Sequence, residues 1–274
     1  MKITALVENT SNRPELRSEH GLSLLIEWND RRILFDTGAS ELFAENAEKL
    51  GIDLALVDRL VLSHGHYDHG GGLKKFLTLN DRARIYIRTN AFDRMVAEKP
   101  EGGFENIGLE PTIQFNERIQ FTEGQSLIED GLEVFSHVTG SVLSPSGNSD
   151  LKRQAGNAFI QDDFGHEQNL IIREGDNLLL LTGCAHRGIV NILEYFKQER
   201  GEYPTHVMGG FHLHNLTADL DEAPETVIKI GEYLNSTGAL CYTCHCTGKN
   251  SYQRLKDVMG DRINYLATGD TIII

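Results

Sequence analysis

Short apolar runs alternate with amphipathic segments along the whole chain, and this alternation predicts a mixed α/β fold. The apolar runs are rich in Leu, Ile and Val, and turn-forming residues lie beside most of them, as expected for buried strands. The triplet Gly-Asp-Asn at 175–177 separates two such runs and predicts a hairpin. Strands are expected at residues 1–7, 22–28, 31–38, 58–65, 84–90, 131–138, 169–174, 178–183, 205–213, 238–248 and 263–274.

Helices are predicted where apolar residues recur every three or four positions. Phe43, Ala47 and Leu50 share one face of the first such segment, and Pro224 lies near the start of a later one, where proline is tolerated. Residues 140–157 are rich in Ser, Gly and Asn and predict a surface loop near or over a functional site. The expected helices cover residues 41–51, 72–79, 188–198, 222–234 and 251–259.

The chain has 274 residues and shows no repeat, linker or low-complexity tract, so we expect a single domain over 1–274. Its net charge of −14 disfavours nucleic acid and anionic membranes as main partners. No apolar run approaches the roughly 18 residues that cross a bilayer. The N-terminus lacks the long apolar segment of an export signal, which predicts a cytoplasmic protein with four reduced cysteines. No pattern indicates an oligomeric state.

Residues 63–72, Ser-His-Gly-His-Tyr-Asp-His-Gly-Gly-Gly, concentrate metal-binding side chains directly after a predicted buried strand. Alternate residues of an extended chain point the same way, so His64 and His66 can bind one cation while Asp68 and His69 face a second. Neutral imidazole and carboxylate groups are ligands for zinc, manganese and iron. The alternative is a solvated turn that is histidine-rich by chance, which the spacing and the preceding strand disfavour.

The pattern His-x-His-x-Asp-His after a buried strand resembles the hallmark motif of the metallo-β-lactamase superfamily. This resemblance implies a four-layer αβ/βα sandwich, an α/β (α+β) fold with the metals at one edge between two β-sheets. Phe-Asp-Thr-Gly at 35–38 is similar to the first motif of that superfamily, in which the aspartate, here Asp36, supports the metal loop. Asp36-Thr37-Gly38 alone also resembles half of an aspartic protease site, but the chain has no second Asp-Thr-Gly. A plain turn residue is the other alternative for Asp36.

The resemblance covers nearly the whole chain and points to one branch of the superfamily. The name-bearing member of that branch is the 7,8-dihydropterin-6-methyl-4-(β-D-ribofuranosyl)aminobenzene 5'-phosphate synthase of methanopterin biosynthesis. Many other members are uncharacterised metal-dependent hydrolases. The segments that carry the resemblance occur in the order EHGLSLLIEW, ILFDTG, LSHGHYDHGGGL, TGCAHRGIVNIL, GGFHL and HCTG.

The resemblance also implies metal ligands at later strand ends. Where the wider superfamily has an aspartate that bridges two metals, this chain has Cys184, which is either a soft thiolate ligand or a small buried residue. His186, two residues later, is expected to be a ligand and can replace a histidine that is missing from the first metal. His245 matches the final metal histidine of the family. His137 and His166 do not match the pattern and are predicted to be surface or loop histidines.

Three of the four cysteines lie in residues 241–249, and we interpret this stretch as a buried strand that ends at His245. Cys241-x-x-Cys244-His245 spells a haem attachment motif, but haem attachment needs an export route that the chain is not expected to have. A cysteine-only zinc site would need a second cysteine pair. Cys244 and Cys246 are therefore predicted to point away from His245 and to pack.

Residues beside the expected ligands are candidates for substrate contact and proton transfer. Asp68 can take a proton from a water, and His212, near the site in related sequences, can contact substrate or protonate a leaving group. His20 lies in the EHGLS run and can line the pocket. Arg187 and Lys249 can bind a phosphate, with a solvated surface charge as the alternative for each.

This ligand set predicts two divalent metal ions about 3.5–4 Å apart, zinc first, with manganese or iron as alternatives. The expected function is a metal-dependent hydrolase for a small anionic phosphodiester, ester or thioester. The first alternative is a pterin-transferring synthase that releases pyrophosphate, and the second is a di-iron redox protein, because the same fold carries iron in flavin-linked relatives. A metal-binding protein without catalysis is disfavoured, because structural zinc sites are usually closed by four ligands.

Overall fold

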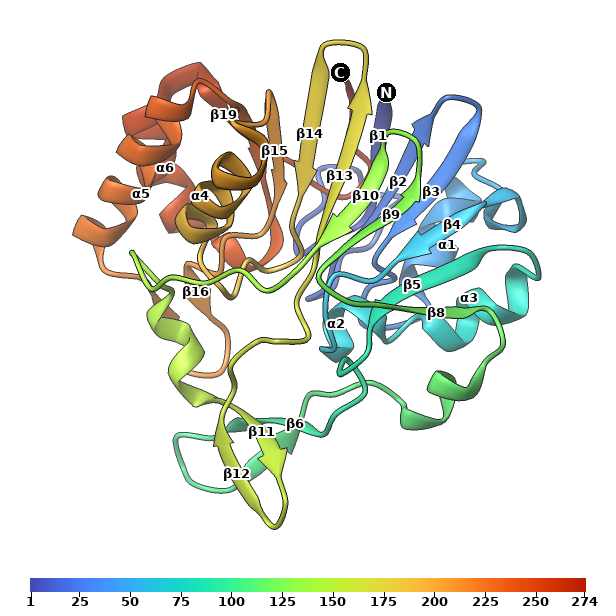
Figure 1. The fold of residues 1–274 in the computed structure, drawn as a ribbon, viewed down its shortest axis with the longest axis horizontal. Coiled ribbons are helices and arrows are strands. Elements are labelled where there is room, and N and C mark those ends of the chain that lie inside the picture. The colour runs from blue at the N-terminus through green and yellow to red at the C-terminus, as the bar shows by residue number, and fades with distance from the viewer.

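Two seven-stranded sheets pack face to face in the computed structural model, which describes residues 1–274 (Figure 1). The first sheet contains, in spatial order, β20 (Thr271–Ile273), β1 (Lys2–Val7), β2 (Ser23–Trp28), β3 (Arg31–Phe35), β4 (Arg59–Val61), β5 (Arg84–Arg88) and β8 (Ile119–Thr122). The second sheet contains β19 (Ile263–Tyr265), β18 (Leu240–Thr243), β15 (His206–Gly209), β14 (Asn177–Leu181), β13 (Asn169–Glu174), β10 (Leu132–Phe135) and β9 (Gln125–Glu129).

Helices cover the outer face of each sheet, which confirms the predicted four-layer αβ/βα sandwich (Figure 1). All five predicted helices are present. The first sheet is covered by α1 (Leu42–Lys49) and α3 (Leu73–Leu79), and the second by α4 (Ile189–Arg200), α5 (Pro224–Thr237) and α6 (Lys249–Met259). The short helix α2 (Tyr67–Gly70) follows β4 and belongs to the metal loop.

Three separate apolar cores hold these four layers together. In β14, Leu179 and Leu181 face the core between the two sheets, while Leu178 and Leu180 face the core beneath the outer helices. Successive side chains of a strand point to opposite faces, so a strand with both faces buried must be apolar at every position. The near-continuous apolar run in this strand therefore follows from its place in the sandwich.

The C-terminal run was expected to form one strand over 263–274, and this prediction is wrong. The run is broken into β19 and β20, which belong to different sheets. A turn separates them: Gly269 has a φ of 88°, and the amide of Ala267 donates to Oδ2 of Asp270 at 2.8 Å. The chain thereby crosses from the second sheet to the first, where β20 pairs antiparallel with β1.

A small third sheet also departs from the prediction. Residues 140–157 were expected to form a surface loop, but they contain the 3-10 helix η3 (Ser146–Asp150) and the strand β11 (Leu151–Ala155). This sheet projects below the sandwich in Figure 1. Three of its four strands consist mostly of exposed or half-buried residues and therefore lack the apolar pattern of a buried strand. Its spatial order is β12 (Ala158–Gln161), β11, β6 (Met95–Glu98) and β7 (Phe104–Asn106).

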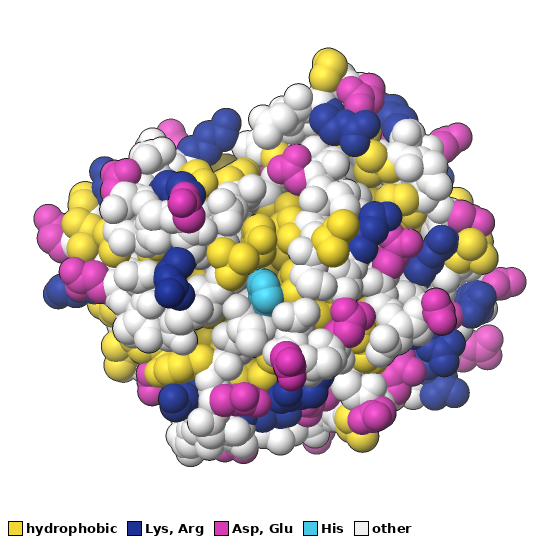
Figure 2. Space-filling model, turned by 90° about the horizontal axis from the view of Figure 1, so that it is seen from above, with side chains coloured by type: hydrophobic (Ala, Val, Ile, Leu, Met, Phe, Trp, Pro, Cys, Tyr) yellow, Lys and Arg dark blue, Asp and Glu magenta, His cyan; other side chains and the backbone are white.

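The outer surface carries charges of both signs. Figure 2 shows the face at which β13 and β14 turn, where acidic and basic side chains are interspersed and no basic patch forms. None of the helices combines the length and the apolar composition that crossing a bilayer requires.

Candidate metal centre

The metal-binding motif predicted at 63–72 lies at the end of β4 and continues through α2. Its ligand candidates are buried: His64 and His69 are fully covered, and His66 and Asp68 expose only 4% and 6% of their surface. Buried polar side chains need partners, because burial without a hydrogen bond or an ion is costly. The loop therefore presents four metal-binding groups to the interior of the protein.

Two glycines allow this loop to pack closely against its neighbours. A Cβ atom at Gly65 would overlap the carbonyl oxygen of Ala91, and one at Gly71 would overlap that of Ala39. Any other residue would push the loop away from these two backbone segments. The glycines in the motif therefore fix the position of the histidines between them.

Asp36, at the end of β3, holds the loop from below. Its Oδ1 accepts the amide of Ser63 at 2.7 Å, and its Oδ2 accepts the Ser63 hydroxyl at 2.7 Å. Oδ2 also lies 2.6 Å from Nδ1 of His69. The residue has a φ of 61°, a left-handed conformation that aspartate tolerates better than most residues. These contacts are those that the predicted support role requires.

Two further histidines are oriented in the same way. Nδ1 of His245 lies 2.8 Å from Oδ1 of Asn9, and Nδ1 of His186 lies 3.0 Å from Oδ1 of Asn148. An amide oxygen only accepts, so each Nδ1 carries its hydrogen and each Nε2 keeps a free lone pair. Histidine ligands of metals are usually oriented by such an outer hydrogen bond.

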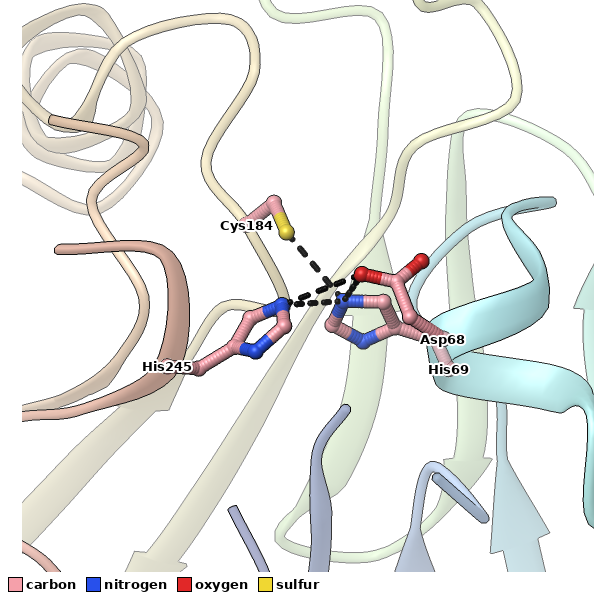
Figure 3. Close-up of side chains that lie close together, drawn as sticks. All are labelled: Asp68, His69, Cys184 and His245. Atoms are coloured by element: carbon pink, nitrogen blue, oxygen red, sulfur yellow. Dashed lines mark hydrogen bonds and ion pairs between the residues drawn. The ribbon is translucent and has the colours of Figure 1, made fainter. Parts of the chain in front are cut away.

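The first group of donors consists of Asp68, His69, Cys184 and His245, whose ligand atoms all lie within 4.8 Å of one another (Figure 3). Nε2 of His69 is 3.1 Å from Nε2 of His245 and 3.1 Å from Sγ of Cys184. Oδ2 of Asp68 is 3.2 Å from Nε2 of His245. Figure 3 shows these side chains converging from separate segments on one space. Their donor types suit a zinc-class cation.

The second group lies directly beside the first. Nε2 of His64 is 3.1 Å from Nδ1 of His66, and His64 also groups with Cys184 and His186 within 4.8 Å. Nε2 of His186 is buried and has no hydrogen-bond partner. The rings of His64 and His69 are 4.1 Å apart, so the two groups adjoin. Each of the two adjoining groups could hold a metal ion.

Burial and neighbouring carboxylates set the protonation of these groups. Burial, and then the neighbouring His166, lowers the pKa of His66 to about 3, so its imidazole is neutral. For His69, burial opposes the charge, but Asp36 and Asp68 outweigh it and raise the pKa to about 9. Burial also opposes the charge on Asp68, but His69 and His20 hold the pKa of that carboxyl well below its usual range.

A cavity of about 470 Å³ opens onto both groups. His66, Asp68, Cys184 and His186 line its inner end, and other lining residues come from β6, β7 and η3. His20 also lines it, with Nε2 3.1 Å from Oδ2 of Asp68. The donors are therefore buried but reachable from solvent by a small molecule, as an open metal site requires.

The comparisons with known proteins agree with this geometry. The sequence model described as the Metallo-beta-lactamase superfamily matches residues 17–148. The crystal structure of Tm1679, a metal-dependent hydrolase of the beta-lactamase superfamily, is 31% identical and has a TM-score of 0.84. This match covers 100% of this chain and 99% of that one. The chain belongs to the metallo-β-lactamase superfamily.

Two further relatives carry other names. The 7,8-dihydropterin-6-methyl-4-(beta-D-ribofuranosyl)-aminobenzene-5'-phosphate synthase of Methanocaldococcus jannaschii is 29% identical over 266 residues, covering 90% of this chain and 88% of that protein. An anaerobic nitric oxide reductase flavorubredoxin of Enterobacter sp. (strain 638) is 24% identical over 197 residues, 69% of this chain and 37% of that protein. The resemblance to the superfamily and to the synthase branch is thus confirmed, but the reaction type is not fixed by it.

His166 lies in a loop, as predicted, but it is not at the surface. It is 1% exposed and lies behind the superfamily motif, where its Nδ1 accepts the amide of Gly65 at 3.1 Å. Nε2 must then carry the hydrogen, and it lies 3.2 Å from Oδ2 of Asp162. Both nitrogens are used, so this histidine supports the loop, and its ring also groups with His66 and Asp162 within 4.8 Å. His137 is exposed, as predicted.

The cysteines divide into two pairs. Cys241 and Cys244 are fully buried in two different apolar cores, which agrees with packing. Cys246 was also predicted to point away from the site, and this is wrong: it lines the cavity, and its sulfur groups with Cys184 and His212 within 4.8 Å. The strand ends before His245, and the 3-10 helix η4 (His245–Thr247) turns the next side chain back toward the cavity.

The two predicted phosphate-binding residues do not line this cavity. Lys249 is exposed at the start of α6, and Arg187 donates to the backbone oxygen of Asp163 beside a separate pocket. His212 does line it, with both ring nitrogens lacking a hydrogen-bond partner. The lysine that reaches the cavity is Lys99, which the sequence analysis did not single out.

Supporting residues were also missed. Asn9, Asn148 and Glu167 contact the ligands or their backbone, and Glu167 accepts the amides of His186 and Arg187. They are scattered along the chain without a motif, so only their contacts identify them.

Proposed function

We propose that this protein is a metal-dependent hydrolase that acts on a small molecule entering the cavity. The observation that carries this proposal is the common orientation of His69, His186 and His245. Each gives one ring N–H to an outer oxygen, and the other nitrogen belongs to one of the two adjoining groups of donors, which share Cys184. Such an arrangement has no purpose in an apolar core, but it is what cation binding needs.

We assign the donors to two cations. His64, His66 and His186 would hold the first, and Asp68, His69 and His245 the second, with Cys184 beside both groups. Zinc suits these donors, and manganese or iron are the alternatives. Two such cations activate water and polarise a carbonyl or phosphoryl oxygen.

The protein's own residues would position the substrate and move protons. His69, and after it His20, whose Nε2 lies 3.1 Å from Oδ2 of Asp68, keep this carboxylate ionised, so that Asp68 can accept a proton from a water. His212 lines the cavity with both ring nitrogens free, which suits contact with the substrate or proton transfer to a leaving group.

The substrate is proposed to be a small ester, thioester or phosphodiester. The cavity offers Lys99 as its single Lys or Arg side chain, and Lys99 is paired with Glu105 at 3.0 Å. One negative charge can be balanced by the cations themselves. A diphosphate carries more charge and is usually bound by several Arg or Lys side chains.

The pterin-transferring synthase is the second candidate, and the relative that bears this name supports it. In that reaction a dihydropterin alkylates an aromatic ring and pyrophosphate leaves. The cavity lining favours the hydrolase, because Arg187 and Lys249 lie outside it. A di-iron redox protein is the third possibility, and metal analysis separates it from the other two.

The test combines metal analysis with activity assays. The purified, untagged protein is expected to hold about two zinc or manganese ions per chain. It is expected to hydrolyse p-nitrophenyl esters, a thioester or bis-p-nitrophenyl phosphate, and His64→Ala should abolish the activity. Release of pyrophosphate from a dihydropterin diphosphate, without hydrolysis of the other compounds, would support the synthase instead. Two irons with visible absorption, without hydrolysis of these compounds or release of pyrophosphate, would contradict both.

A further inference from the structure

We propose that Cys184, Cys246 and His212 form a third metal site, which takes a soft divalent cation of the zinc and cadmium class and leaves one position open to the cavity. Their two sulfur atoms and a ring nitrogen of His212 lie within 4.8 Å of one another. All three residues line the cavity. The site goes beyond the proposed pair of cations, whose six ligands do not include Cys246 or His212.

The topology of the second sheet brings these residues together. Cys184, His212 and Cys246 follow β14, β15 and β18 respectively, and these strands are parallel neighbours. The carboxyl ends of parallel neighbours lie at the same edge of a sheet. Residues far apart in the chain are therefore held side by side there by strand pairing, independently of the histidine motif.

Local contacts fix the sulfur of Cys246 in place. Sγ of Cys246 accepts the amide of His212 at 3.3 Å and lies 3.6 Å from the carbonyl oxygen of Cys184. A Cβ atom at Gly210 would come within 2.5 Å of this sulfur, so glycine makes room for it. The thiol is thus built into the wall of the cavity rather than left on a flexible surface.

His212 supplies the reason to expect a bound ion. Both ring nitrogens are inaccessible to solvent and lack a hydrogen-bond partner, and the residue has a φ of 50°. A buried polar atom without a partner is costly, and a strained backbone persists only when its surroundings hold it. A cation between the ring and the two sulfurs would satisfy the free nitrogen.

The donor types decide which ion fits. Two thiolates and one imidazole form a soft set, unlike the imidazoles and carboxylate of the proposed pair. Two cysteines and one histidine with an open fourth position are also a known arrangement for catalytic zinc. Cys184 lies 3.1 Å from Nε2 of His69, so this third site adjoins the second cation. His212 would then be a ligand and not the proton donor.

Cobalt(II) titration tests this proposal, because thiolate–cobalt bonds absorb in the near ultraviolet whereas histidine and aspartate ligands do not. The metal-free protein, kept reduced and free of oxygen, is expected to bind one equivalent more than Cys246→Ala or His212→Ala binds. In both variants the thiolate–cobalt absorption band should be weaker than in the wild-type protein. Cys244→Ala is the matched control, because Cys244 is two residues from Cys246 and packs in the core. This variant should bind as much cobalt as the wild-type protein and keep the full thiolate band.

Other outcomes overturn the proposal. If Cys246→Ala keeps the full band and the full stoichiometry, Cys246 is not a ligand. If only Cys184→Ala loses the band, a single thiolate serves the histidine and aspartate ligands, and the proposed hydrolase centre stands without a third site. Cys246→Ser repeats the measurement with a residue of similar size should the alanine variant unfold. Loss of the band and of all bound cobalt in His64→Ala would show that the thiols do not bind a cation on their own.

Discussion

Oδ2 of Asp36 lies 2.6 Å from Nδ1 of His69, and this contact fixes which ring nitrogen of His69 faces the proposed metal centre. The same carboxylate accepts two hydrogen bonds from Ser63, the residue that begins the metal loop. One buried side chain therefore sets both the path of the loop and the orientation of a ligand at its end. Its influence on metal binding is indirect but measurable.

Asp36→Asn is expected to lower metal affinity by about 10–100-fold, the usual effect of removing an outer partner of a ligand. Asparagine has the same shape and tolerates the left-handed backbone. Its single side-chain oxygen cannot accept hydrogen bonds from His69, the Ser63 amide and the Ser63 hydroxyl together. Competition with a coloured chelator measures the affinity. Asp58→Asn is the control, because Asp58 is a buried carboxylate directly before β4, where it accepts the amide of Arg32. Equal affinities in the two variants would contradict the support role.

His64→Ala, His66→Ala and His245→Ala are each expected to reduce bound metal by at least one ion while the protein stays folded. The reason is that each removes one of the three proposed ligands of a cation, and the two ligands that are left bind it more weakly. Elemental analysis gives the metal content, and circular dichroism checks the fold. His137→Ala, an exposed histidine, is the control. Full occupancy in all three variants would refute the assignment.

Metal binding is expected to release a proton from His69. Its pKa is raised to about 9, so in the metal-free protein the imidazole is charged at neutral pH, whereas a ligand must be neutral. Affinity should therefore rise with pH until about 9. Calorimetry in two buffers of different ionisation enthalpy counts the protons. Affinity that is constant between pH 7 and 9 would show that His69 is not the protonated ligand.

The same shift predicts how the stability of the metal-free protein depends on pH. The pKa of His69 in the folded protein lies above its value of about 6.5 in the unfolded chain. The contribution of His69 to the free energy of unfolding is therefore fully present below a pH of about 6.5. It is then lost as the pH rises through about 9. Urea unfolding between pH 6 and 10 measures this decrease in the free energy of unfolding. The decrease should be smaller in Asp36→Asn, because Asp36 is a main cause of the raised pKa of His69.

Gly183→Ala is expected to destabilise the fold by about 1–3 kcal/mol and to weaken metal binding. A Cβ atom at this position would overlap Oγ of Ser63, so the loop that carries Cys184 and the metal loop would be forced apart. Thermal unfolding and chelator competition give the two effects. Gly108→Ala is the control, since the nearest atoms to a Cβ there are 3.4 Å away. Wild-type behaviour of Gly183→Ala would mean that this close approach does not position the site.

The sequence by itself determined most of the buried strands, the five long helices and the main ligand motif. Strands such as β14 are apolar along nearly their whole length because both faces are buried. The five predicted helices each cover a sheet with one face only, so their apolar residues recur every three or four positions. His64, His66, Asp68 and His69 lie within six residues, so local geometry alone brings them together. Residues this close in the chain can be interpreted without knowing the fold.

Only the tertiary structure decided which distant residues join them. Cys246 reaches the cavity because η4 turns the chain directly after His245, and His166 is buried because Gly65 and Asp162 use both of its nitrogens. Lys249 resembled a phosphate ligand but lies on the exposed start of α6. The direction of a side chain after a strand end depends on the turn that follows and on the packing of neighbouring segments, and neither leaves a periodic pattern in the sequence.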